Sequence, residues 1–197
     1  MKTLTKSLTL VLLVAFAFAS CAKQPTQEMD AAKAAIQAVV AAKGDVYAKD
    51  ELKKLNDDLQ VATDEVNAQA KKFFKKYGKA KEMLAKVVTD ADAVKALVPA
   101  RIEEAKNAAL AAQTAAKAAF DEAKALLEKA PKGKGTKADI EAMKADLAGL
   151  ETQLVEVQTA FDGADFFGAK DKATVIKDKA TAISEQVKAA IEKVKGK

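Results

Sequence analysis

The apolar residues of the stretch 140–161 constrain the fold of this chain more than any other feature. They recur in unbroken steps of three and four over three heptads. The seven residues are Ile140, Met143, Leu147, Leu150, Leu154, Val157 and Phe161. A repeat of this period places all its side chains on one narrow stripe of an α-helix, which needs another helix to cover it. The stretch therefore predicts helices that pack side by side.

Ladders with the same spacing occupy four other stretches, 29–39, 52–73, 77–98 and 166–194. Their large apolar members are expected in the core. These are Leu52, Leu55, Leu59, Val66, Phe73, Leu84, Val87, Ile176, Ile183 and Val187. Ala and Lys dominate the composition, with only 8 Gly and 3 Pro, as is typical of long helices. No period-two alternation indicates a strand, so we expect an all-α fold.

Turn-forming residues divide the ladders. Gly44 is expected to end the first helix, and Asp50 is a candidate N-cap for the next. The segment 71–78 predicts a turn or kink. Pro99 is expected to kink or end the third helix.

The second half of the chain repeats the first. The ladder 140–161 matches 52–73 position for position at an offset of 88, and 166–187 matches 77–98 at an offset of 89. The segment 115–120 matches 31–36 at an offset of 84. The offset changes only where loops are expected, which indicates an internal duplication.

Each copy contains three amphipathic stripes, and none of them can be buried alone. We expect an elongated antiparallel bundle or coiled coil made of two tandem three-helix units, 29–98 and 99–197. One helix over about residues 77–129 could join them through Pro99. The alternative is a single bundle of long hairpins, and the pattern does not separate the two.

The N-terminus resembles a secretory signal. Lys2 and Lys6 precede an apolar stretch, 8–19, which is too short to span a bilayer. Ala19, Ser20 and Cys21 resemble the bacterial lipobox, in which the Cys becomes the acylated first residue. We therefore expect a signal peptide over 1–20, cleaved between Ser20 and Cys21, and a short tether over 21–28.

Phe18 departs from the usual Leu of a lipobox, and the order Ala17, Phe18, Ala19 also fits ordinary signal-peptidase cleavage. That cleavage would leave Cys21 as a free thiol. In lipoproteins of this kind, a residue such as Ala22 in place of Asp after the Cys implies delivery to the outer membrane in some bacteria. We expect a protein of the bacterial envelope, anchored in the outer membrane and facing the periplasm.

Composition excludes several classes of function. The net charge is +5, but acidic and basic residues interleave and Arg101 is the only arginine, so we expect no nucleic-acid binding. The chain has no His and one Cys. It therefore lacks the usual general base and any Cys-cluster metal site. We expect no enzyme activity, cofactor or metal.

Several motifs resemble a known group of proteins. They are Ser20-Cys21 with Pro25, Glu28, Met29, Ala31 and Ala34; Tyr47-Ala48 with Glu51-Leu52; and Tyr77 with Ala80-Lys81. The chain resembles the uncharacterised Ala-rich helical lipoproteins of bacterial envelopes, a domain-of-unknown-function family. The resemblance covers about residues 20–97, and 115–195 more weakly. It implies a helical fold and an envelope location but supplies no catalytic residue.

Surface contacts could come from two places. Tyr47 is either a contact residue or an aromatic cap on the end of the bundle. The four lysines Lys71, Lys72, Lys75 and Lys76 flank two Phe. They could touch anionic lipid or another polyanion, or they belong to a solvated turn over core aromatics.

The C-terminal Lys197 resembles that of small Ala-rich outer-membrane lipoproteins whose last Lys is joined to peptidoglycan. A Lys-ended helix is also common on electrostatic grounds. We expect a membrane-anchored scaffold, spacer or adaptor for another envelope protein or for peptidoglycan. The alternative is a carrier whose amphipathic helices bind lipid or another hydrophobic ligand.

Overall fold

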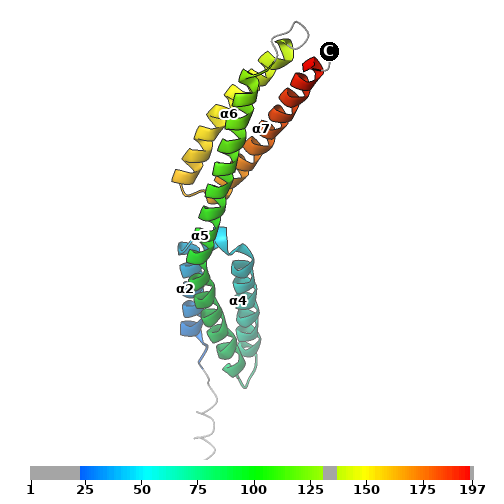
Figure 1. The fold of residues 1–197 in the computed structure, drawn as a ribbon. Helices are drawn as coiled ribbons and strands as arrows, with labels where there is room; N and C mark the ends of the chain where they lie inside the picture. The colour runs from blue at the N-terminus through cyan, green and yellow to red at the C-terminus, as the bar shows by residue number, and fades with distance from the viewer. Residues whose placement is uncertain (1–22, 131–136, 196–197) are drawn as a thin grey trace, which may run out of the picture. The chain divides into compact units, whose positions relative to one another are not determined.

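The computed structural model describes residues 23–130 and 137–195, and all of their regular structure is helical. The helices are α2 (Thr26–Ala41), α3 (Gly44–Tyr47), α4 (Lys49–Ala70), α5 (Gly78–Glu128), α6 (Lys137–Asp162) and α7 (Phe166–Lys195) (Figure 1). The all-α expectation is confirmed for this part of the chain. Ser20, Cys21, the expected signal peptide and Lys197 lie outside the described residues.

The chain divides into two compact units, the first ending at Arg101 and the second beginning at Ile102. The helix α5 contributes to both, because it continues through Pro99 without a break in its bounds. Pro99 is exposed. A proline inside a helix removes one backbone hydrogen bond and crowds the preceding turn. Flanking residues of high helix propensity, such as Ala96 and Ala100, favour continuation of the helix.

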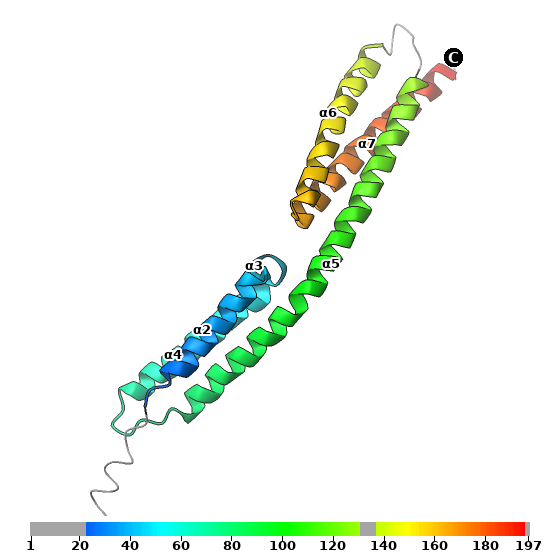
Figure 2. The ribbon, with the colours of Figure 1, turned by 90° about the vertical axis from the view of Figure 1, so that its left-hand side faces the viewer.

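The first unit contains α2, α3, α4 and the first part of α5 (Figure 2). Its core is a column of small and medium apolar side chains on the ladder positions. The buried residues include Ala32, Ile36, Val39, Leu55, Ala62, Val66, Leu84, Val87, Val94 and Val98. Because many of these side chains are small, the area buried per residue is modest and stability depends on helix length.

The second unit contains the rest of α5 with α6 and α7. Its buried residues follow the same spacing. They include Ala116, Phe120, Leu127, Ile140, Leu147, Leu150, Val157, Ile176, Ile183 and Val187. Ser184 is also buried here, beside the ladder residue Ile183.

Some ladder residues are only half-buried. They include Leu52, Leu59, Met143, Leu154 and Phe161, and Val194 near the end of the last ladder is 49% exposed. The Phe161 ring lies edge-on to Phe166, with centroids 5.3 Å apart, at the turn between α6 and α7.

Phe73 is not a core residue, so this part of the predicted ladder is wrong. Its side chain is 87% exposed. The helix α4 ends at Ala70, and beyond that point the helical period no longer decides which way a side chain faces. Tyr77, which is 4% exposed, supplies the buried aromatic ring of this connection.

The N-terminal tether is shorter than expected, because Thr26, Gln27 and Glu28 form the first turn of α2. Pro25 precedes them and is buried. Its fixed φ suits a helix start, and the acidic Glu28 suits the positive end of the helix dipole.

The connection between α2 and α4 also differs from expectation. Lys43, with φ of 69°, adopts the left-handed conformation, and Gly44 begins the short helix α3. A Cβ on Gly44 would lie 2.4 Å from Val39 Cγ1, so glycine is needed for close approach. Ala48 occupies the N-cap position of α4, and Asp50 lies inside its first turn.

Candidate functional site

One end of the first unit brings together the start of α2 and the connection between α4 and α5 (Figure 1). Lys81, in the first turn of α5, lies with its Nζ 2.6 Å from Glu28 Oε1 in the first turn of α2. Lys79 Nζ lies 3.8 Å from Glu65 Oε2 on α4. Glu28, seven residues after Cys21 in the sequence, therefore lies beside the start of α5.

We call residues 71–76 the basic aromatic loop. Phe73 and Phe74 are 87% and 65% exposed, and their rings meet edge-on with centroids 4.9 Å apart. Gln69 organises the loop: its carbonyl accepts from Lys72 N at 3.0 Å, and its Oε1 accepts from Lys76 N at 3.4 Å. The two apolar rings therefore project from a backbone that is held at both ends.

All four lysines of the basic aromatic loop are exposed, and the loop contains no acidic residue. The nearby carboxylates have partners of their own. A hydrogen bond from Lys81 lowers the pKa of Glu28, and a hydrogen bond from Gln69 lowers the pKa of Glu65. Lys71, Lys72, Lys75 and Lys76 thus add positive charge that these two carboxylates do not offset.

Tyr47 lies elsewhere in the first unit, and of its two interpretations, a surface contact or an aromatic cap, the surface contact is wrong. Its side chain is 7% exposed. Its carbonyl oxygen accepts a hydrogen bond from Arg101 Nη1 at 3.0 Å. The same guanidinium binds both carboxylate oxygens of Glu51, so α3, α4 and α5 meet at this residue. The Arg101 hydrogen bond holds the Glu51 pKa down at about 2.

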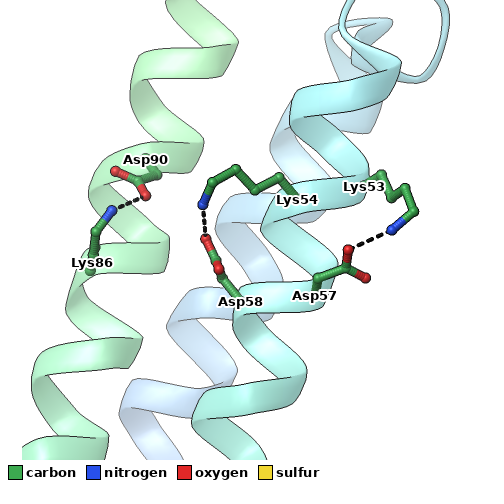
Figure 3. A network of polar contacts seen from close by, with 6 residues as sticks. All are labelled: Lys53, Lys54, Asp57, Asp58, Lys86 and Asp90. Atoms are coloured by element: carbon green, nitrogen blue, oxygen red, sulfur yellow. Dashed lines mark hydrogen bonds and ion pairs between the residues drawn. The ribbon is translucent and has the colours of Figure 1, made fainter.

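Figure 3 shows the charged face where α4 and α5 lie side by side. Three Lys–Asp pairs connect residues four apart on one helix: Lys53–Asp57, Lys54–Asp58 and Lys86–Asp90. Their hydrogen bonds raise the pKa of Lys53 and Lys54. Exposed pairs of this kind contribute little to stability, because water and salt screen the attraction between their charges. The face has the properties of a solvated helix surface.

A groove of about 440 Å³ lies between α5 and α6 in the second unit. Phe120, Leu127 and Leu147 form its apolar floor. Its rim carries Lys124, Glu128, Lys144 and Glu151. The groove contains an apolar strip but no His or Cys and no chemical group prepared for catalysis.

Within residues 23–130 and 137–195, no three His, Cys, Asp or Glu residues gather where they could hold a metal ion. Over the same residues, no helix is both long and apolar enough to cross a bilayer. Comparison of the chain with protein-family models, curated proteins and solved structures gave no match.

Sequence reasoning had singled out the four lysines but placed Phe73 in the core beside them. A local feature of the sequence indicates that Phe73 is exposed. Lys71 and Lys72 directly follow the end of α4, and a run of like charges is typical of a solvated segment. The reasoning also missed Arg101 and Glu51, which are 50 residues apart in the chain.

Proposed function

We propose that this chain is a lipoprotein of a bacterial cell envelope, whose helical body is a non-catalytic scaffold, spacer or partner-binding adaptor. The observation that carries the proposal is the position of Cys21. It follows a charged and then apolar leader, and it stands only five residues before Thr26, where α2 begins. An acylated Cys21 would therefore hold the folded body directly at a membrane surface. A set of several acyl chains gives lasting attachment, whereas one chain is marginal.

The architecture of the proposed body is two three-helix units that arose by duplication. Its support is the burial of matched positions. At the offset of 89, seven pairs are buried in both copies. They are Tyr77 and Phe166, Ala80 and Ala169, Leu84 and Ala173, Val87 and Ile176, Ala91 and Ala180, Val94 and Ile183, and Val98 and Val187. A shared core pattern over a whole helix favours a common origin.

The case for a scaffold comes from how the described residues are used. Ladder residues fill the core, and interleaved Lys, Asp and Glu cover the helix faces. Such surfaces suit spacing and specific docking, and they leave no prepared acid–base pair or nucleophile.

Mass spectrometry of the mature N-terminus tests the anchor. We expect a peptide that starts at Cys21 and carries acyl chains, and a Cys21→Ser chain that is released from the membrane fraction. An unmodified chain that starts at Ser20 would overturn the proposal. Crosslinking in intact cells, with the Cys21→Ser chain as control, would identify the partner protein.

The location we propose is the periplasmic face of the outer membrane, because Ala22 follows Cys21. Separation of inner and outer membranes tests it, and recovery of the acylated chain with the inner membrane would contradict it. A link from Lys197 to peptidoglycan is tested by muramidase digestion of sacculi. A released peptide that ends at Lys197 would support the link, and a digest without this peptide would contradict the link.

A second function, carriage of a lipid or other hydrophobic ligand, is favoured by the groove between α5 and α6. Its 440 Å³ falls within the range of small-molecule sites, about 300–1,000 Å³. Extraction and mass spectrometry of the purified chain would reveal co-purifying lipid. The Leu147→Lys variant, which places a charge on the groove floor, should then lose that lipid.

A further inference from the structure

We propose that the basic aromatic loop docks on the anionic phospholipid surface that holds the acylated N-terminus, as a second membrane contact of the same protein. This inference rests on the proposed function, since it takes the anchor as the first contact. It assigns an occupant to an exposed apolar and basic patch of the first unit. Three features of the loop support the proposal: its position in the first unit, its exposed apolar rings and its positive charge.

The position follows from chain connectivity. Thr26 is five positions after Cys21, and a fully extended chain over five positions spans no more than about 18 Å. Glu28 and Lys81, one turn into α2 and α5, form an ion pair of 2.6 Å. The basic aromatic loop ends just before α5 begins, so it lies at the same end of the first unit as the start of α2 (Figure 1).

The apolar contribution comes from two phenylalanines. Phe73 and Phe74 are the two most exposed aromatic side chains among the large hydrophobic residues of the described chain. Their rings touch only edge-on, at 4.9 Å, which leaves most of their surface in water. Aromatic rings insert favourably at the boundary between headgroups and acyl chains. A bilayer would cover both rings together.

Charge selects an anionic surface. Lys71 and Lys72 precede the two rings and Lys75 and Lys76 follow them, and all four are exposed. Lys79 and Lys81 pair with Glu65 and Glu28 at the same end. The first turn of α5 holds no acidic residue, and Glu82 is the fifth residue of this helix. Each Lys held near an anionic bilayer strengthens binding about fivefold at moderate ionic strength. A soluble polyanion would use the lysines but not the rings.

Co-sedimentation with lipid vesicles tests the loop without the anchor. The chain from residue 21 onward, carrying Cys21→Ser, is mixed with vesicles of phosphatidylcholine alone or of phosphatidylcholine with the anionic lipid phosphatidylglycerol. We expect binding to the anionic vesicles only, and weaker binding as salt shortens the Debye length.

Two loop variants separate the contributions of rings and charges. Phe73→Ser with Phe74→Ser should weaken binding at least about tenfold, and Lys→Gln at positions 71, 72, 75 and 76 should abolish it. The matched control removes four exposed lysines elsewhere, Lys95, Lys170, Lys177 and Lys193, and should keep the loop-dependent binding. Because the loop side chains are exposed, helix content should stay the same in circular dichroism.

A fluorescent reporter locates the contact in the acylated protein, because the chain has no Trp. Phe74→Trp should be quenched by brominated acyl chains in anionic vesicles. Val61→Trp, at a 56% exposed position in the middle of α4, should not be quenched. Equal quenching at both positions, or none at Phe74→Trp, would overturn the proposal.

The two proposals fail in different ways. A Cys21→Ser chain that ignores anionic vesicles, or binds them as well without the two rings, overturns the docking of the loop and leaves the acyl anchor untouched. An unacylated mature N-terminus together with ring-dependent vesicle binding overturns the anchor and supports the docking. Binding to a soluble polyphosphate that is equally strong in the Phe73→Ser, Phe74→Ser chain would also contradict a lipid occupant.

Discussion

Arg101 on α5 donates hydrogen bonds to both carboxylate oxygens of Glu51 on α4, and its Nη1 also donates to the Tyr47 carbonyl at 3.0 Å. The only arginine of the chain therefore ties together three helices of the first unit. A planar guanidinium can make these bonds at once, whereas a lysine ammonium acts as a single point of charge.

The Arg101→Lys variant tests this contact. We expect a loss of about 1–2 kcal/mol in the free energy of unfolding, because one ammonium cannot replace the paired bonds and the side chains are about one-third exposed. Urea unfolding followed by circular dichroism measures it. As a control, Lys53→Ala removes an exposed pair on α4 and should change the free energy of unfolding far less. Equal losses in the two variants would contradict a special contribution of the Arg101–Glu51 contact to stability.

The same pair predicts a dependence of stability on acid. Arg101 lowers the pKa of Glu51 from an ordinary 4.5 to about 2. A carboxylate with a depressed pKa stabilises the fold fully above its unfolded pKa, and this contribution disappears as the pH falls through the folded value. We therefore expect the Glu51 contribution to fade between about pH 4.5 and pH 2.

Unfolding midpoints measured over this pH range should fall less steeply for Glu51→Gln than for the natural chain. The variant loses stability at neutral pH but has no carboxyl at this position to titrate. Parallel curves for the two chains would show that Glu51 is not responsible. An NMR titration of the Glu51 carboxyl carbon gives the folded pKa directly.

The buried face was predictable from sequence most fully along the first part of α5, whereas ladder residues inside α4 and α6 such as Leu59 and Leu154 are only half-buried. Every ladder position from Tyr77 to Val98 is buried. The repeat of 3.5 residues keeps these side chains on one face of the helix, and that face packs into the core. The prediction failed at Phe73 because the period carries no information about where the helix stops. Three residues past Ala70, the ring points to solvent.

The candidate site was only half predictable for the same reason. The run of positive charge identifies Lys71 and its neighbours in the sequence. The exposure of Phe73 and Phe74 depends on the loop backbone, which hydrogen bonds to Gln69 hold in place. The Arg101–Glu51 contact depends on two helices meeting across 50 residues of sequence. A periodic pattern identifies which face of a helix is buried, and it leaves open which polar groups meet at the edges of that face.

Substitution of Gly44 and of Gly149 by alanine should change the free energy of unfolding in opposite directions. A Cβ on Gly44 meets Val39 Cγ1 at 2.4 Å and the Val39 carbonyl oxygen at 2.8 Å, so Gly44→Ala should cost about 1–3 kcal/mol. Gly149 lies inside α6 with nothing within 4 Å of a new Cβ. Gly149→Ala should therefore add about 0.5–1 kcal/mol through helix propensity. Thermal unfolding of both variants measures the difference, and a shared sign would contradict the local geometry.

Leu84 and Leu97 provide a matched pair on one helix. Both belong to α5 within the first unit, but Leu84 is 0% exposed and Leu97 is 49% exposed. Leu84→Ala should cost about 2–5 kcal/mol, since it removes buried methyl groups and leaves a cavity. Leu97→Ala should change stability by less than about 0.5 kcal/mol. Losses of similar size in urea unfolding would refute the assignment of the buried face.

Ser184 is the opposite case, a polar residue in the core. Its Oγ is buried on α7 and has no hydrogen-bond partner among the described residues. Burial of an unsatisfied hydroxyl costs about 1–3 kcal/mol, and alanine has the higher helix propensity. Ser184→Ala should therefore raise the free energy of unfolding by about 1 kcal/mol. Thr181→Ala on the exposed face of α7, where the hydroxyl already donates to the Lys177 carbonyl, is the control and should change little. A loss of stability in Ser184→Ala would mean that the hydroxyl has a role that its position in the core does not explain.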